Sequence, residues 1–141
     1  MKGVLYRHAL GDAEVIKEII DLNPKEYGFT FSSCVKAGDF IFTAHHAGFL
    51  DEDGNVIEGI EAQTERCLTN LGNTLKAAGA SFDDVVKTTV LLRNSEDFKM
   101  MREVYRRYFS KGFPARTGIV GTDFLDSECL IQIDAVAYKP T

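Results

Sequence analysis

Arg116 is the side chain whose setting best suits a chemical role. It directly follows Phe113-Pro114-Ala115, where a predicted helix has ended and a predicted strand begins. Because proline fixes its backbone φ angle, this stiff segment can hold the guanidinium at the edge of a sheet. A permanently charged, planar guanidinium grips a carboxylate through two parallel hydrogen bonds. The alternative is a structural ion pair with one of the 21 acidic side chains, which the spacing alone favours.

Two further motifs invite a metal hypothesis. His45 and His46 are adjacent, so on a strand they point to opposite faces of the sheet and cannot easily share one ion. We expect one imidazole to be buried and hydrogen-bonded, and the other to lie near solvent. The segment Asp51-Glu52-Asp53-Gly54-Asn55 begins like a calcium loop, but its glycine comes two places early and Ala62 stands where the loop needs glutamate. The residues therefore indicate a turn, and no metal.

The cysteines and the short catalytic motifs exclude several classes of protein. Cys34, Cys67 and Cys129 are odd in number, widely spaced and without a C-x-x-C pair, so neither a disulfide framework nor a zinc site is indicated. We predict core thiols in a reducing cytosol. The sequence also lacks the nucleophile elbow, the phosphate loop, the H-E-x-x-H motif and the dinucleotide-binding fingerprint.

The elements that must position these residues alternate between period-two and period-3.6 spacing, which is typical of one mixed α+β domain. Strands are predicted at residues 29–35, 40–46, 85–92, 115–120 and 129–138, with turns at residues 36–39 and 51–55. Helices are predicted from Ile60 to Ala78 and from Asn94 or Ser95 to Gly112. Strand–helix–strand order occurs twice, which predicts crossover connections and parallel neighbours in a mixed sheet.

Periodicity also predicts which side chains are buried. The first helix has one apolar stripe, formed by Leu68, Leu71, Leu75 and Ala78. The second helix gathers Phe98, Met101, Tyr105, Tyr108 and Phe109 on one side. On its other side, Glu103 is expected to pair with Arg107 at i+4.

The last strand has two unlike faces. One face carries Ile131, Ile133, Ala135 and Ala137, and the other carries Leu130, Gln132, Asp134, Val136 and Tyr138. The second set is too apolar for open water and too polar for an ordinary core. It predicts a subunit interface or the wall of a pocket.

Length and charge limit the possible partners. A chain of 141 residues, 45% hydrophobic and 26% charged, fits one domain with a packed core. It has 16 basic against 21 acidic side chains and no continuous basic run, which argues against nucleic acid. We find no signal-peptide pattern and no membrane-spanning stretch, so we expect no membrane partner and a cytoplasmic location. Residues 13–22 have helical spacing and could cover a sheet edge or another subunit.

Collinear motifs run through most of the chain. They are Val35-Lys36-Ala37-Gly38-Asp39-Phe40-Ile41-Phe42, Gly54-Asn55-Val56, Ala62-Gln63-Thr64, Leu75-Lys76-Ala77-Ala78-Gly79-Ala80-Ser81, Asp84-Val85-Val86-Lys87-Thr88-Thr89-Val90, Phe113-Pro114-Ala115-Arg116-Thr117 and Ile131-Gln132-Ile133-Asp134-Ala135-Val136-Ala137. Together they resemble the RidA/YjgF family. The resemblance covers about residues 28–141 of a single domain spanning residues 1–141, and it leaves residues 1–27 as an N-terminal extension.

The resemblance implies a fold like that of the small chorismate mutases. In it, a mixed β-sheet packs against two α-helices on one face, and three subunits pack their sheets into a central β-barrel. Ligand pockets lie between neighbouring subunits of this homotrimer. The best-known members hydrolyse reactive imines and enamines to 2-oxo acids and ammonia, without a metal or a cofactor.

The resemblance also assigns roles to single residues. Arg116 matches the arginine that holds the substrate carboxylate, which reverses the preference for an ion pair. Gln132 stands where the family has the glutamate that orients the attacking water, and an amide cannot accept a proton as a carboxylate can. The other substituted pocket positions are Phe31 for a tyrosine, Ala44 for a serine, Arg102 for an asparagine and Gly118 for a cysteine. The second positive charge, on Arg102, allows a dicarboxylate or a larger acid.

Two functions follow from these residues. In the first, a cytoplasmic homotrimer deaminates small 2-imino or enamine acids, with Arg116 as anchor and Gln132 as a weak water positioner. In the second, the same inter-subunit pocket only binds a small carboxylate-bearing metabolite. The ribonuclease label often attached to the family conflicts with the acidic charge balance, and we rank it last.

Overall fold

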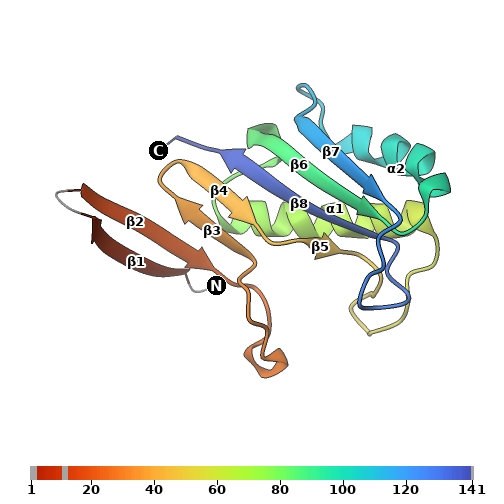
Figure 1. Cartoon of the computed structure of the whole chain (residues 1–141), viewed down its shortest axis with the longest axis horizontal. Coiled ribbons are helices and arrows are strands. Elements are labelled where there is room, and N and C mark those ends of the chain that lie inside the picture. The colour runs from red at the N-terminus through yellow and green to blue at the C-terminus, as the bar shows by residue number, and fades with distance from the viewer. Residues whose placement is uncertain (1–2, 11–12, 141) are drawn as a thin grey trace.

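Eight strands form one sheet in the computed structural model, which describes residues 3–10 and 13–140. The order is β1-β2-β3-β4-β8-β6-β7, and the short β5 also pairs with β8 (Figure 1). The strands are β1 (Gly3–Leu10), β2 (Ala13–Ile20), β3 (Cys34–Ala37), β4 (Phe40–Thr43), β5 (His46–Ala47), β6 (Val85–Leu92), β7 (Ala115–Val120) and β8 (Ile131–Tyr138). Helices α1 (Ile60–Ala77) and α2 (Phe98–Tyr105) cover one face, which confirms the predicted mixed α+β arrangement.

The sheet is antiparallel except at one edge. There β6 and β7 run parallel and are connected through α2, as the predicted crossover requires. The other crossover, through α1, does not give adjacent parallel strands, because β8 inserts between β4 and β6 and is antiparallel to both. As a result β7, which carries Arg116, is an edge strand.

The predicted β3–β4 hairpin forms, but both strands are shorter than expected. Gly38, with φ of +58°, occupies the two-residue turn between them. Cys34 already faces Thr43 at the end of the ladder, so residues 29–33 have no strand opposite them and form a loop. The predicted strand at residues 40–46 breaks after Thr43, whose hydroxyl accepts the backbone hydrogen bond from Ala135 at 3.0 Å. This break between β4 and β5 opens one wall of a cavity described below.

The helices bury the faces that their periodicity predicts. Leu68, Leu71 and Leu75 on α1 are fully buried, and Gly79 ends the helix region with φ of +83°. The second helical segment is α2 flanked by the 3₁₀ turns Ser95–Asp97 and Arg106–Tyr108, and it buries Met101, Val104, Tyr105 and Phe109. Two further 3₁₀ turns, Lys25–Tyr27 and Phe82–Asp84, come earlier in the chain.

All three cysteines are buried free thiols, as predicted. Within the described residues, no helix is both long and apolar enough to cross a membrane.

The predicted ion pair between Glu103 and Arg107 is wrong. The helix tightens to 3₁₀ geometry after Tyr105, which brings Glu103 closer to Arg106, at 3.8 Å. Arg107 instead reaches across to α1, where its guanidinium lies 3.1 Å from the carboxylate of Glu65. The pair therefore joins the two helices rather than stabilising one of them.

The helical spacing at residues 13–22 is also misleading. This segment forms β2, which pairs antiparallel with β1 on one side and with β3 on the other, with Ile20 opposite Cys34. The edge of β3 offers backbone hydrogen bonds to a neighbouring strand. These bonds outweigh the weak preference for a helix that comes from apolar residues spaced three or four apart. The segment does cover a sheet edge, which was one of the two roles considered for it.

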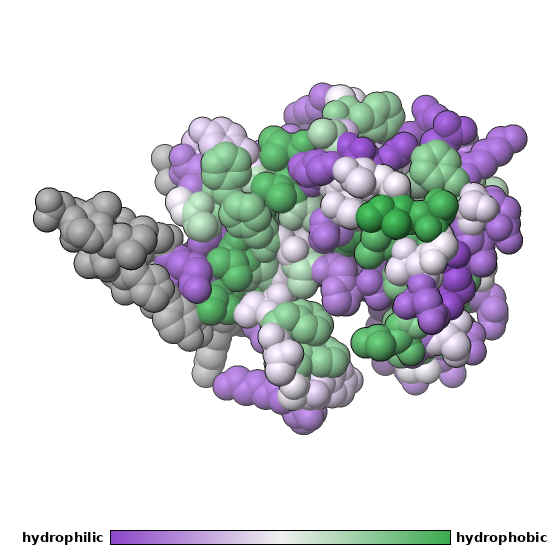
Figure 2. Space-filling model, in the orientation of Figure 1, coloured by the Kyte–Doolittle hydropathy of each residue, from purple (hydrophilic) through white to green (hydrophobic). Residues whose placement is uncertain are grey.

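The sheet face opposite the helices is open. On β8, the side chains of Ile131, Ile133, Ala135 and Ala137 are buried toward the helices, as predicted. On the opposite face, Phe40 and Phe42 of β4 and Tyr138 of β8 form an accessible aromatic group, with 44%, 48% and 43% of each residue exposed. Their rings pack as a cluster, with centroids 5.1 Å apart for Phe40 and Tyr138. Figure 2 shows apolar side chains gathered on this face.

Candidate functional site

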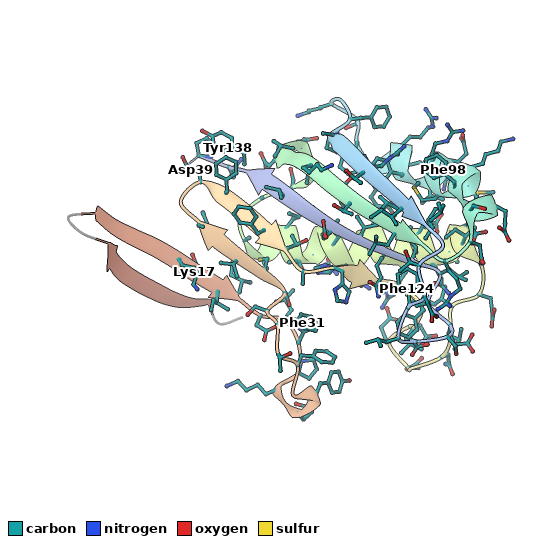
Figure 3. The ribbon with its side chains drawn as sticks, viewed as in Figure 1. Lys17, Phe31, Asp39, Phe98, Phe124 and Tyr138 are labelled. Atoms are coloured by element: carbon teal, nitrogen blue, oxygen red, sulfur yellow. The ribbon has the colours of Figure 1, made fainter. Side chains whose placement is uncertain are left out.

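Arg116 lies on β7 opposite Thr88 of β6, on the helix side of the sheet. Thr88 is fully buried, and its hydroxyl hydrogen-bonds that of Tyr105 at 2.8 Å. The guanidinium carbon of Arg116 lies 5.0 Å from the ring centre of Tyr105 and 5.4 Å from that of Phe98 (Phe98 is labelled in Figure 3). Two aromatic faces therefore hold the cation in place.

No ion pair among the described residues involves Arg116. The alternative that Arg116 forms a structural ion pair therefore has no support among the described residues. A cavity of about 310 Å³ opens beside the guanidinium, and we call it the arginine cavity. It is lined by Arg102, Tyr105, Arg106, Phe113, Pro114 and Arg116, with no acidic side chain among them.

The electrostatics of the arginine cavity favour an anion. Three guanidinium groups share a small volume, and of these Arg106 lies 3.8 Å from the carboxylate of Glu103. Burial raises the pKa of Tyr105, although Thr88 and Arg116 act against this shift, so its hydroxyl stays protonated at neutral pH. The arginine cavity can thus bind a carboxylate, but it has no group suited to accept a proton.

A second cavity, of about 380 Å³, brings together three other predicted site residues, Phe31, Ala44 and Gln132. We call it the amide cavity because amide side chains recur around it. Its remaining lining residues are Leu22, Asn23, Ser33, His45, His46, Ala47, Phe49, Asn70, Asn73 and Thr74. They come from the loop before β3, from the break between β4 and β5, and from α1.

The two histidines differ as predicted in their hydrogen bonds and exposure, although His46 is half-buried rather than fully buried. The ring of His46 lies 2.9 Å from the carbonyl oxygen of Ala44 through Nδ1 and 2.7 Å from the hydroxyl of Thr74 through Nε2. Burial is the main cause that lowers the pKa of His46, so this imidazole is neutral near pH 7. His45 is exposed. No group of three or more potential metal ligands occurs within the described part of the chain.

The segment at residues 51–55 is a turn, as predicted. The carboxylate of Asp51 accepts backbone hydrogen bonds from Asp53 and Asn55, each at 2.9 Å. These bonds, that to Asn55 above all, lower the pKa of Asp51. Gly54 has φ of +82°, and Leu50 forms a bridge with Val56 across the turn. The acidic side chain is therefore used to close the loop.

An aromatic row at the amide cavity was not predicted from the sequence. Tyr27 meets the ring of Phe29 edge to face, with ring centres 5.5 Å apart, and Phe29 stacks on Phe31 at 5.1 Å. The row ends at His45, 5.5 Å from Phe31, and it lies on the loop that projects below the sheet (Figure 3). Alternation of aromatic residues at every second position was the available signal, but it was absorbed into the incorrect strand at residues 29–35. Asn70, Asn73 and Thr74 were also missed, although they form one patch at i, i+3 and i+4 on α1.

The two cavities do not meet within one chain. In the sheet register, Gln132 lies in one row with Leu91 and Ile119, whereas Arg116 lies in a row with Thr88 and Ala135. The rows are three residues apart along each strand, so their side chains point to opposite faces. Arg102 and Arg116 thus share one cavity, and Phe31, Ala44 and Gln132 share the other. Gly118 lines neither, but a Cβ there would lie 3.4 Å from the ring of Phe98 beside Arg116.

These features define a class of small α+β proteins with one mixed sheet, two helices on one face and an arginine-lined cavity at the sheet edge. The particular family follows from comparison with known proteins. The family model described as Endoribonuclease L-PSP matches residues 26–139. A RutC family protein of Pyrococcus abyssi is 41% identical over 126 residues, which span 87% of this chain and 98% of the relative. The chain therefore belongs to the RidA/YjgF family.

Two further comparisons carry more informative names. The human 2-iminobutanoate/2-iminopropanoate deaminase is 36% identical over 110 residues, which span 77% of this chain and 80% of that protein. The crystal structure of RidA from the Antarctic bacterium Psychrobacter superposes with a TM-score of 0.72 at 32% identity, covering 78% of this chain and 89% of that one. The family match begins at residue 26, so β1 and β2 precede it.

Proposed function

We propose that this protein hydrolyses small 2-imino or enamine acids to 2-oxo acids and ammonia. The observation that carries the proposal is Arg116. Its guanidinium is held over two aromatic rings, faces a cavity without acidic side chains, and makes no ion pair within the described chain. A cation in this setting is prepared for the carboxylate of a small ligand rather than for a structural partner.

The names of two relatives support the choice of reaction. The human relative is named for the deamination of 2-iminobutanoate and 2-iminopropanoate, and an Arabidopsis relative is named Reactive Intermediate Deaminase A. The second is 38% identical over 108 residues, which span 74% of this chain. That this protein catalyses the same reaction is our proposal. It must account for the pocket residues in which this chain differs from the family pattern.

We further propose that the working unit is a homotrimer in which the arginine cavity of one copy adjoins the amide cavity of the next. Two observations support this assembly. First, Arg116 and Gln132 lie on opposite faces of the sheet, so a single chain cannot present both to one small molecule. Second, the open sheet face exposes the ring cluster of Phe40, Phe42 and Tyr138, which a second copy can cover.

In the proposed reaction, Arg116 binds the substrate carboxylate and fixes the position of the imine carbon. Gln132 hydrogen-bonds the attacking water, but its amide cannot take up the proton that the water loses. Holding water and imine in contact can still accelerate a reaction that is intrinsically easy. Arg102, whose guanidinium lies 5.5 Å from the ring centre of Phe98, adds a second positive charge for acids with a second carboxylate.

The test is a trapping assay. An amino-acid oxidase or dehydratase generates 2-iminobutanoate in the presence of semicarbazide, and the protein is added at increasing concentration. We expect less semicarbazone and a matching amount of 2-oxobutanoate and ammonia. Unchanged semicarbazone at high protein concentration would end the deaminase proposal for this substrate. Calorimetry with 2-oxobutanoate would then show whether the cavity only binds carboxylates.

A further inference from the structure

Two adjacent residues that line the amide cavity, His45 and His46, carry side chains that could transfer a proton. Of the side chains that line this cavity, only those of His45 and His46 are imidazoles, the group that most often transfers protons in enzymes, since the others are amides, hydroxyls and apolar groups. Gln132, which takes the place of a carboxylate, cannot act as a base. If water is activated in this cavity, an imidazole must accept the proton.

The ring of His46 is occupied by hydrogen bonds within the protein. Both of its ring nitrogens have partners, the carbonyl oxygen of Ala44 and the hydroxyl of Thr74. Its burial also favours the neutral form, which opposes the uptake of a proton. These contacts make His46 a structural link between the break in the sheet and α1.

His45 has the opposite properties. It is exposed, and no hydrogen bond to its ring occurs within the described residues. Phe31 contacts the ring from one side, with centres 5.5 Å apart, and Phe29 stacks behind Phe31 at 5.1 Å. The aromatic row therefore fixes the imidazole at the mouth of the cavity without using its nitrogens.

We propose that His45 transfers the proton in the deamination, in place of the carboxylate that Gln132 has replaced. The inference rests on the proposed function and deepens it. The oxygen of water bonds to the carbon of the protonated imine, one water proton passes to the imidazole, and the C=N electron pair moves to nitrogen. The imidazolium returns that proton to the amino group. The C–N bond then breaks to release ammonia, while the hydroxyl proton passes to the imidazole and the carbonyl forms. The imidazolium finally gives this proton to the departing ammonia, which leaves as ammonium and restores the neutral imidazole.

The charged surroundings of His45 are simple. Within the cavity lining, its only titratable neighbour is His46, which is neutral. Asp21 flanks the lining residue Leu22, but its carboxylate accepts hydrogen bonds from Asn23 at 2.8 Å and from the hydroxyl of Ser33 at 3.2 Å. Gln132 on β8 and Asn70 and Asn73 on α1 carry no charge. A change in the pH dependence of the reaction when His45 is substituted should therefore reflect the loss of that imidazole.

The experiment compares the wild-type protein with His45→Asn in the trapping assay, over pH 5.5–8.5. General acid–base catalysis contributes roughly 10²–10⁴-fold, so we expect His45→Asn to lower kcat by at least tenfold and to flatten its pH profile. Affinity for 2-oxobutanoate should stay within about twofold, because Arg116 still binds the carboxylate. In His45→Ala, added imidazole should restore part of the activity, whereas it should leave the wild-type rate unchanged.

The outcomes separate the two proposals. If the wild-type protein deaminates and His45→Asn keeps its rate and pH profile, the role of His45 is wrong and the proposed function stands. If His45→Ala loses activity but imidazole restores none of it, the residue is structural and the inference again fails. If the wild-type protein itself does not deaminate, both the proposed function and the role of His45 are overturned.

Discussion

The arginine cavity and the amide cavity are similar in volume, about 310 Å³ and 380 Å³, but opposite in chemistry. The first gathers three permanently charged guanidinium groups and has no proton acceptor. The second has no permanent charge, yet it offers amides and imidazoles that can position water and move a proton. Each cavity lacks what the other has. The first has the charge to hold an anion but no group to act on it, and the second has groups that could act on a ligand but no charge to hold it.

The two cavities also differ in how they are built. The arginine cavity stands on regular elements, since Arg116 is on β7 and its aromatic supports Phe98 and Tyr105 are on α2. The amide cavity lies at an irregularity, where the strand predicted at residues 40–46 breaks and a loop folds over it. In the proposed trimer, the regular elements of one copy would hold the anchor for the substrate carboxylate, and the irregular wall of the next copy could vary with the substrate.

The largest expected effect comes from removing the anchor. Arg116→Ala should abolish deamination, because a desolvated carboxylate left without its partner costs about 2–5 kcal/mol, or roughly 30-fold and more in affinity. Calorimetry with 2-oxobutanoate and the trapping assay measure the two consequences. Arg107→Ala is the matched control, since this arginine binds Glu65 on α1 and lines neither cavity. Equal affinity for Arg116→Ala and wild type would show that the arginine cavity is not the binding site.

A site shared between copies can be tested by disabling one cavity on some copies and the other cavity on the rest. Asn73→Trp should fill the amide cavity from an exposed position on α1, and Arg116→Ala empties the arginine cavity of its anchor. Each variant should be inactive alone. In randomly mixed oligomers, about a quarter of the sites between copies combine two intact halves, so about a quarter of the activity should return. Differently tagged, co-purified mixtures that stay inactive would contradict a site shared between copies.

A smaller effect should distinguish the two arginines within one cavity. Arg102→Asn keeps Arg116 and removes the second cation, so it should weaken binding of a 2-oxo dicarboxylate about tenfold, the value of one charged hydrogen bond. Binding of 2-oxobutanoate should change little. The measurement is the ratio of the two dissociation constants in wild type and variant. An unchanged ratio would mean that Arg102 does not contact the ligand.

Much of the fold is readable from periodicity, because burial on one face imposes it. The stripe of Leu68, Leu71 and Leu75 and the alternation of Ile131 and Ile133 both correspond to buried faces. What the sequence could not supply is pairing between distant segments. Residues 13–22 have a weak helical pattern, yet residues 13–20 form a strand, and the edge of β3 pairs with residues 17–20 of it.

The site was predictable residue by residue, but its geometry was not. The setting of Arg116 after proline is local, and its exposure beside a cavity follows. Its separation from Gln132 depends on the register of three strands, which no local pattern specifies. The role that we propose for His45 depends likewise on the break between β4 and β5, because a continuous strand would have directed its side chain away from Phe31.

The smallest effect tests whether His46 is the structural member of the histidine pair. Burial lowers the pKa of His46 in the folded state below the value of about 6.5 for an unfolded chain. The unfolded state therefore binds more protons in the window below pH 6.5, so the free energy of unfolding should fall as the pH drops through it. Urea denaturation at pH 7.5 and pH 5.5 measures this slope. His46→Gln should reduce the slope while His45→Asn leaves it in place, and the reverse result would exchange the roles of the two imidazoles.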